Sequence, residues 1–164
     1  MFNLVLSISV SIIVYLGDNN LFMYLLIGYG LFRTFEIIIY QINVILFHPY
    51  RSRLIGKEYK IKSPTRIVIL LFHNYFEIIF WYSSVYIVIS QYIGIGASYR
   101  WYDYIKMSFL CFVTFDPSLA EFSGFSYIVS NIAFTELFAG FIMTIISLAR
   151  FIGLLPEVES IEKI

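Results

Sequence analysis

The chain is poor in charge. Only 13% of its 164 residues are Asp, Glu, Lys or Arg, whereas 60% are hydrophobic and 20% are aromatic. Soluble domains carry roughly 25% charged residues, because their surface must face water. With a mean hydropathy of +0.81, this shortage of charge predicts an all-α integral membrane protein that contacts lipid over most of its length.

Other absences exclude further classes of protein. The only cysteine, Cys111, excludes an intrachain disulfide framework and a cysteine-based metal site. His48 and His73 are not placed in a His-Glu-x-x-His pattern, and no nucleotide-binding loop or Gly-x-Ser-x-Gly elbow occurs. We therefore expect no catalysis, no metal and no cofactor. A net charge of zero gives no reason to expect nucleic acid as a partner.

Four apolar stretches predict four membrane spans. The first, Phe2 to Leu16, falls just short of the ~17–25 residues that a helix needs to cross. A secretory signal is the alternative, although no Lys or Arg precedes the stretch and no Ala-x-Ala site follows it. A turn at 17–20 joins it to the second stretch, residues 21–47, as a helical hairpin. The third and fourth spans are expected at 67–93 and about 125–155.

A basic segment, residues 51–66, separates the N-terminal hairpin (1–50) from the third span. Short loops rich in Lys and Arg stay in the cytoplasm, which places both termini there and the protein in the inner (plasma) membrane. A basic patch for nucleic acid is the alternative. The tail, 157–164, is short and acidic. The basic residues of the segment are Arg51, Arg53, Lys57, Lys60, Lys62 and Arg66.

A short apolar segment, residues 104–115, lies between the third and fourth spans. As a helix it is about 18 Å long, too short for a ~30 Å hydrocarbon core. It either lies at the interface or dips into the membrane and returns, and the pattern alone fits both. Asp116-Pro117 would end such a helix, and residues 118–124 would lead back. In the second case, residues 67–156 have the plan of a two-helix channel pore with a re-entrant helix.

Four ionisable residues fall inside the expected spans. Arg33 and Glu36 are three positions apart on one helical face, and His73 and Glu77 are four apart on another. Each pair can neutralise its charges within its own helix. Since charge at membrane depth is costly, these residues predict a polar seam that joins the spans, or alternatively a proton relay or a gate.

The fourth span carries the motifs of a resemblance. Glu136 precedes Gly140 by four residues, and an Ala-Arg pair ends the helix at Arg150. This pattern resembles the inner helix of small bacterial two-helix potassium channels, and residues 107–114 resemble the pore helix of that family. The resemblance, over residues 67–155, implies a tetramer in which Glu136 holds the back of the pore helix. It also implies that Gly140 allows a close helix approach or a bend, and that Arg150 reaches lipid headgroups.

The selectivity filter of that family is missing. Where its members read Thr-Val-Gly-Tyr-Gly-Asp, this chain has no glycine to turn successive carbonyls toward an axis. Potassium selectivity is therefore not implied. In a tetramer, Asp116 and Glu121 would instead form carboxylate rings that favour cations, or they are solvated loop charges. The filter-like residues are Thr114, Phe115, Asp116, Pro117, Ser118 and Glu121.

Two functions follow as hypotheses. The first is a tetrameric cation pore of weak or altered selectivity. The second is a non-conducting, channel-like scaffold that recruits a soluble cytoplasmic partner on the 51–66 segment. In size and span number the chain is similar to membrane components of bacterial antiphage systems, such as Kiwa. Membrane lipids are expected partners in both cases.

Overall fold

The computed structural model describes residues 2–17, 21–47, 50, 51, 54–56, 64–94, 98–116 and 126–152, and within these residues the chain is helical and has no strand. Its elements are, in order, α1 (Phe2–Leu16), α2 (Leu21–Ile42), the π-helix η1 (Asn43–Phe47), α4 (Pro64–Ile93), α5 (Trp101–Thr114) and α6 (Ser126–Ile152).

Three of these helices, α2, α4 and α6, are long and apolar enough to cross a membrane. The expectation of an all-helical membrane protein is thereby confirmed. At 15 residues, α1 is about 22 Å long, shorter than a ~30 Å hydrocarbon core.

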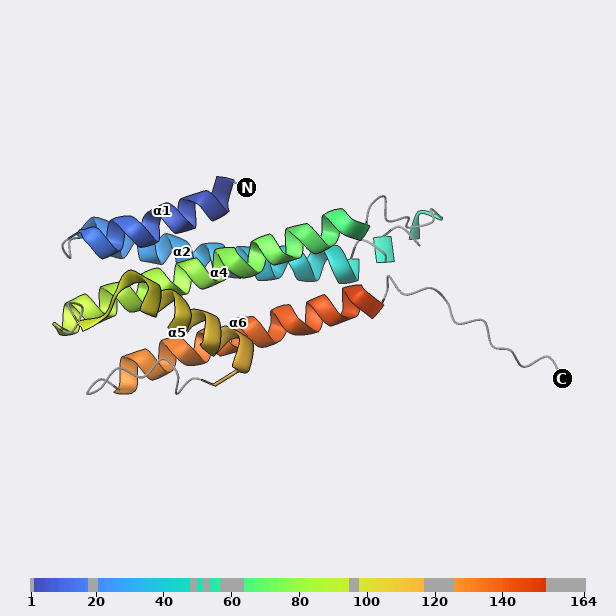
Figure 1. Ribbon diagram of the computed structural model, residues 1–164. Coiled ribbons are helices and arrows are strands. Elements are labelled where there is room, and N and C mark those ends of the chain that lie inside the picture. The colour runs from blue at the N-terminus through green and yellow to red at the C-terminus, as the bar shows by residue number, and fades with distance from the viewer. Residues whose placement is uncertain are drawn as a thin grey trace.

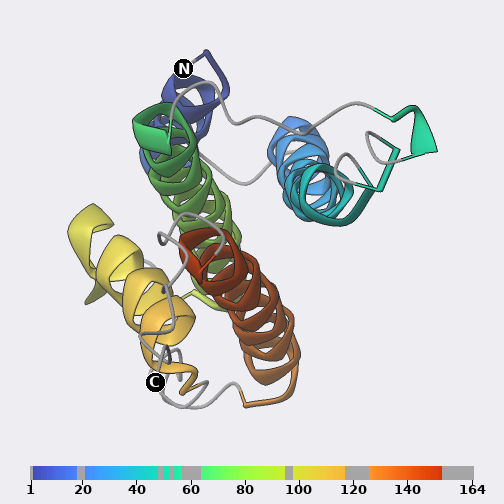
Figure 2. The same cartoon turned by 90° about the vertical axis from the view of Figure 1, so that its right-hand side faces the viewer.

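The bundle is organised around α4, which packs against α1, α2, α5 and α6. Figure 1 shows α2, α4 and α6 running the length of the bundle, with α1 along one side of α4 and α5 on the side of α6. In Figure 2, viewed along the helices, α2 and α5 lie on opposite sides of the central pair α4 and α6. α1 therefore contacts the rest of the molecule chiefly through α4, whereas α6 packs against α2, α4 and α5.

Burial follows the same plan. Trp81 and Tyr86 on α4 are almost fully buried, as are Tyr104 and Phe112 on α5. In contrast, large apolar side chains cover the outside of the bundle, and Phe32 on α2 is 79% exposed. Such an apolar exterior is costly in water and suits a lipid surrounding.

Two helices begin earlier than the sequence pattern predicts. α4 starts at Pro64 rather than at residue 67, because proline has no N–H to lose in the first turn and its φ is already helical. α5 starts at Trp101 rather than at 104, because the Asp103 carboxylate accepts the backbone N–H of Arg100 at 2.8 Å and closes the first turn.

Candidate functional site: two polar clusters inside the bundle

The first cluster is centred on Glu136 of α6, whose side chain is fully buried. Its carboxyl group accepts the Tyr86 hydroxyl of α4 at 2.5 Å and the Ser108 hydroxyl of α5. The Ser108 oxygen also lies 2.9 Å from the Ile79 carbonyl oxygen of α4. A buried carboxyl group is costly unless it is hydrogen-bonded, so these contacts hold α4, α5 and α6 in one arrangement.

Gly140 lies one turn beyond Glu136 and lets α5 approach α6 closely. A Cβ atom at Gly140 would stand 2.7 Å from the backbone oxygen of Phe112, so no larger residue fits without movement. Nearby, the Cys111 sulfur lies 3.7 Å from the Ala133 carbonyl oxygen. Of the two roles considered for Gly140, the structure supports close approach.

These contacts place the end of α5 near the middle of α6. In Figure 1, α5 begins near the end of the bundle where α6 begins, and it ends about halfway along α6. Thr114 in its last turn donates its hydroxyl to the Leu110 carbonyl at 2.6 Å. Phe115 then adopts a left-handed conformation, with φ 56°, so the helix stops before Asp116-Pro117 rather than at it.

The structure describes only some of the filter-like residues, namely Thr114, Phe115 and Asp116. Asp116 is exposed beyond the end of α5. Pro117, Ser118 and Glu121 lie outside the described residues. The carboxylate rings therefore stay a prediction.

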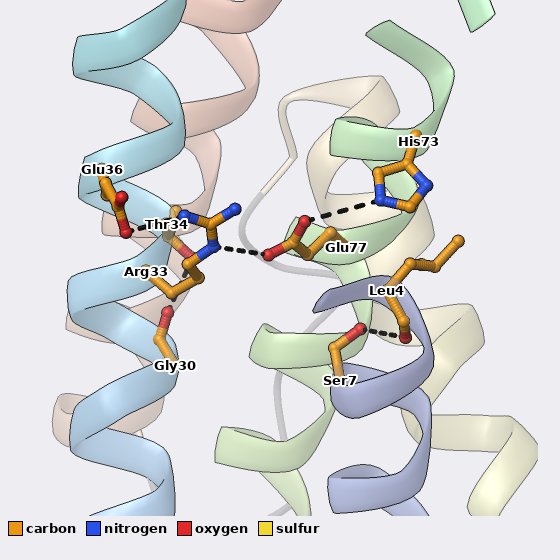
Figure 3. A network of polar contacts seen from close by, with 8 residues as sticks. All are labelled: Leu4, Ser7, Gly30, Arg33, Thr34, Glu36, His73 and Glu77. Atoms are coloured by element: carbon orange, nitrogen blue, oxygen red, sulfur yellow. Dashed lines mark hydrogen bonds and ion pairs between the residues drawn. The ribbon is translucent and has the colours of Figure 1, made fainter. Parts of the chain in front are cut away.

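The second cluster joins α2 to α4 through Arg33 (Figure 3). The Arg33 guanidinium donates from Nε to Glu77 Oε1 at 2.9 Å and pairs through Nη1 with Glu36 Oε2 at 2.7 Å. His73 Nε2 lies 3.9 Å from Glu77 Oε2. The Glu77 side chain is 1% exposed and that of Glu36 is 69% exposed. The polar seam between spans is therefore present, and its main link is a pair between helices.

A cavity of about 340 Å³ adjoins this cluster between α1, α2 and α4. From α1, the Asn3 carboxamide contacts Arg33, and with its oxygen turned toward the guanidinium it accepts from Nη2 at 2.5 Å. Asn74 of α4, which is 7% exposed, also lines the cavity. Its remaining lining side chains are Glu36, Ile37, Tyr40, Leu70, His73 and Glu77.

Arg150 lies in the last turn of α6, as expected, but its guanidinium turns toward α2. It donates from Nη2 to Gln41 Oε1 at 2.5 Å, and Gln41 is fully buried. Arg150 thus links α6 to α2. In the basic segment, Arg51 and Arg66 have exposed side chains. The other four basic residues lie outside the described part of the chain: Arg53, Lys57, Lys60 and Lys62.

Sequence reasoning missed the partners in these clusters. Spacing found the pairs within one helix but not the link from Arg33 to Glu77, because the rotation of α2 against α4 is a tertiary property. One signal was available: α2 and α4 each carry ionisable side chains of opposite sign near their centres. Ser108 and Tyr86 gave no such signal, since isolated hydroxyl groups are common in apolar helices.

Comparison of the chain with models of protein families, with curated proteins and with solved structures finds no match. Within the residues that the structure describes, no group of three or more His, Cys, Asp or Glu side chains is placed to hold a metal ion.

Proposed function

We propose that the chain assembles into a membrane pore that passes cations with weak or altered selectivity, and that α5 is its re-entrant helix. The observation that carries this proposal is the position of α5. With 14 residues it is about 21 Å long, too short to cross, and its end is held at the middle of α6 by Gly140 and the Glu136 cluster.

A half-crossing helix has a chemical consequence. The last carbonyl groups of a helix carry roughly half a negative charge, and α5 would present them at the middle of the membrane. Such an end favours a cation, as half-helices do in channels. Asp116, exposed just beyond that end, would add a carboxylate from each copy. In a tetramer, α6 lines the path.

The orientation follows from the basic segment. The end of α2, the start of α4 and the end of α6 lie at one end of the bundle, whereas α1 starts about halfway along it (Figure 1). Positive segments between spans stay in the cytoplasm, so this end faces the cytoplasm, and α5 enters from the opposite side of the plasma membrane. α1 is the fourth span in this arrangement, and a bilayer can thin locally around such a short helix.

Ion flux into liposomes tests the proposal. Purified protein reconstituted into vesicles should pass K⁺ and Na⁺ at comparable rates and exclude Cl⁻. Neutralising Asp116→Asn or Glu121→Gln should lower cation flux. The control variant is Gly28→Ala on α2, where an added Cβ meets nothing within 4 Å, and it should conduct like the wild type.

Flux no greater than in protein-free vesicles would contradict the proposal. If a soluble partner then co-purified with the membrane protein, and replacing the basic residues of 51–66 by Gln released it, the chain would be a scaffold. If Asp116→Asn and Glu121→Gln both conduct like the wild type, the carboxylate rings are refuted, but the pore itself is not.

A further inference from the structure

The cavity between α1, α2 and α4 is separate from the α5 region, because it lies on the α2 side of α4. We propose that it binds a small organic cation: an ammonium group attached to an apolar body. Four features of the cavity favour such a ligand: its charge, its buried acceptors, the apolar part of its lining and its size.

The charges of the lining do not balance. Two carboxylates, Glu36 and Glu77, face one guanidinium, Arg33, and one imidazole, His73, among the described side chains around the cavity. Arg33 already contacts both carboxylates. With a neutral His73, one negative charge is left over in a region that the flanking spans place inside the membrane, where unpaired charge is costly. A monovalent cation in the cavity would compensate it, whereas a divalent cation would leave an excess of the opposite sign.

The cavity also offers acceptors for an N–H donor. Glu77 gives Oε1 to Arg33 at 2.9 Å, but its Oε2 is 3.9 Å from His73 Nε2, longer than a hydrogen bond. Its side chain is 1% exposed, so bulk water does not solvate this oxygen freely. Asn74, almost as buried, adds a carboxamide to the same wall. An ammonium group, with up to three donors, can satisfy these acceptors together.

The apolar part of the lining favours an organic ion over an inorganic one. Ile37, Tyr40 and Leu70 supply apolar and aromatic surface beside the charged residues. The volume of about 340 Å³ falls at the lower end of the roughly 300–1,000 Å³ that small-molecule sites occupy. It far exceeds the space that a single dehydrated ion needs, and the described residues provide no His, Cys, Asp and Glu cluster suited to a metal.

The exposure of the lining side chains indicates where a ligand would enter the cavity. Glu36, with 69% of its side chain exposed, stands at the opening, while Glu77 lies at the closed side. A ligand would therefore meet Glu36 first and Glu77 last.

Three matched compounds test the site on the full-length protein in detergent by calorimetric titration. 2-Phenylethylammonium has both the charge and the apolar body, 2-phenylethanol has the body alone, and methylammonium has the charge alone. We expect the first to bind at least tenfold more tightly than either of the others. Equal affinity for 2-phenylethanol, or no binding of 2-phenylethylammonium, would overturn the proposal.

Variants then assign the residues. Loss of one carboxylate removes a hydrogen bond to a charged group, so Glu77→Gln and Glu36→Gln should each weaken binding by about tenfold or more. The exposed Glu36 can be replaced without disturbing the core, which keeps the test decisive if Glu77→Gln fails to fold. Asp103→Asn, at the start of α5, is the control and should bind like the wild type. Unchanged affinity in Glu36→Gln, or an equal loss in Asp103→Asn, would refute a site at these carboxylates.

Discussion

The contact between α5 and α6 can be tested with a single methyl group. Replacing Gly140 by Ala would place a Cβ 2.7 Å from the backbone oxygen of Phe112. Because the obstacle is backbone, no side-chain rotation relieves the clash. Ordinary contacts begin at about 3.4 Å, so α5 would have to move away by about 0.7 Å, or α6 would have to bend.

The size of the effect follows from two opposing terms. Overpacking of this kind costs about 1–3 kcal/mol, whereas alanine is favoured over glycine inside a helix by about 0.5–1 kcal/mol. Gly28→Ala on α2 gains the same helical term without the clash, since nothing lies within 4 Å of its added Cβ. The two variants should therefore differ by the overpacking term alone, about 1–3 kcal/mol.

The assay is the free energy of unfolding in detergent, measured by denaturant titration for the wild type, Gly140→Ala and Gly28→Ala. We expect Gly28→Ala to be the most stable and Gly140→Ala the least stable of the three. A Gly140→Ala protein as stable as Gly28→Ala would show that α5 does not pack against the middle of α6, and the proposed pore would lose its main support.

The other polar contacts give further predictions, each read out by the same titration. Tyr86→Phe leaves one oxygen of Glu136 unpaired and should cost about 1–3 kcal/mol, while a loss below 0.5 kcal/mol would speak against the cluster. Arg33→Leu alone leaves the buried Glu77 without its cation and should lower the free energy of unfolding by about 3–5 kcal/mol, whereas Glu77→Leu leaves Arg33 paired with Glu36 and should cost less. The double variant should recover a large part of the Arg33→Leu loss, and purely additive losses would contradict the pair. Gln41→Leu on α2 removes the acceptor of the Arg150 guanidinium and should lower the free energy of unfolding by about 1.5–3 kcal/mol. Wild-type stability in this variant would argue against the link between α2 and α6.

Most of the helices could be predicted because lipid leaves few alternatives. Apolar length, the turn after Leu16 and the proline at 64 are local signals, and the helices begin and end within a few residues of the expected positions. The motif Glu136-x-x-x-Gly140 also indicated two positions that contact α5, since a carboxyl group and a glycine stand out in an apolar helix.

The tertiary pairing could not be predicted in the same way. Which residue of α2 faces Glu77 depends on how α2 is rotated and shifted against α4, and a shift of one residue turns Arg33 by about 100°. For the same reason nothing in the sequence indicated that Arg150 would reach Gln41, or that the start of α1 would close a cavity with Asn3. These contacts depend on residues far apart in the chain, whose positions are fixed only when the helices pack.

The pore proposal requires α5 to enter and leave on the same side of the membrane, and cysteine labelling tests this most directly. In a Cys111→Ser background, single cysteines would replace Ser98 before α5, Tyr127 at the start of α6 and Ile55 in the basic segment, all of which are exposed. With a membrane-impermeant maleimide on sealed vesicles, we predict that positions 98 and 127 react from one side and position 55 from the other. Labelling of 98 and 127 from opposite sides would mean that α5 crosses the membrane, and it would contradict the proposed pore.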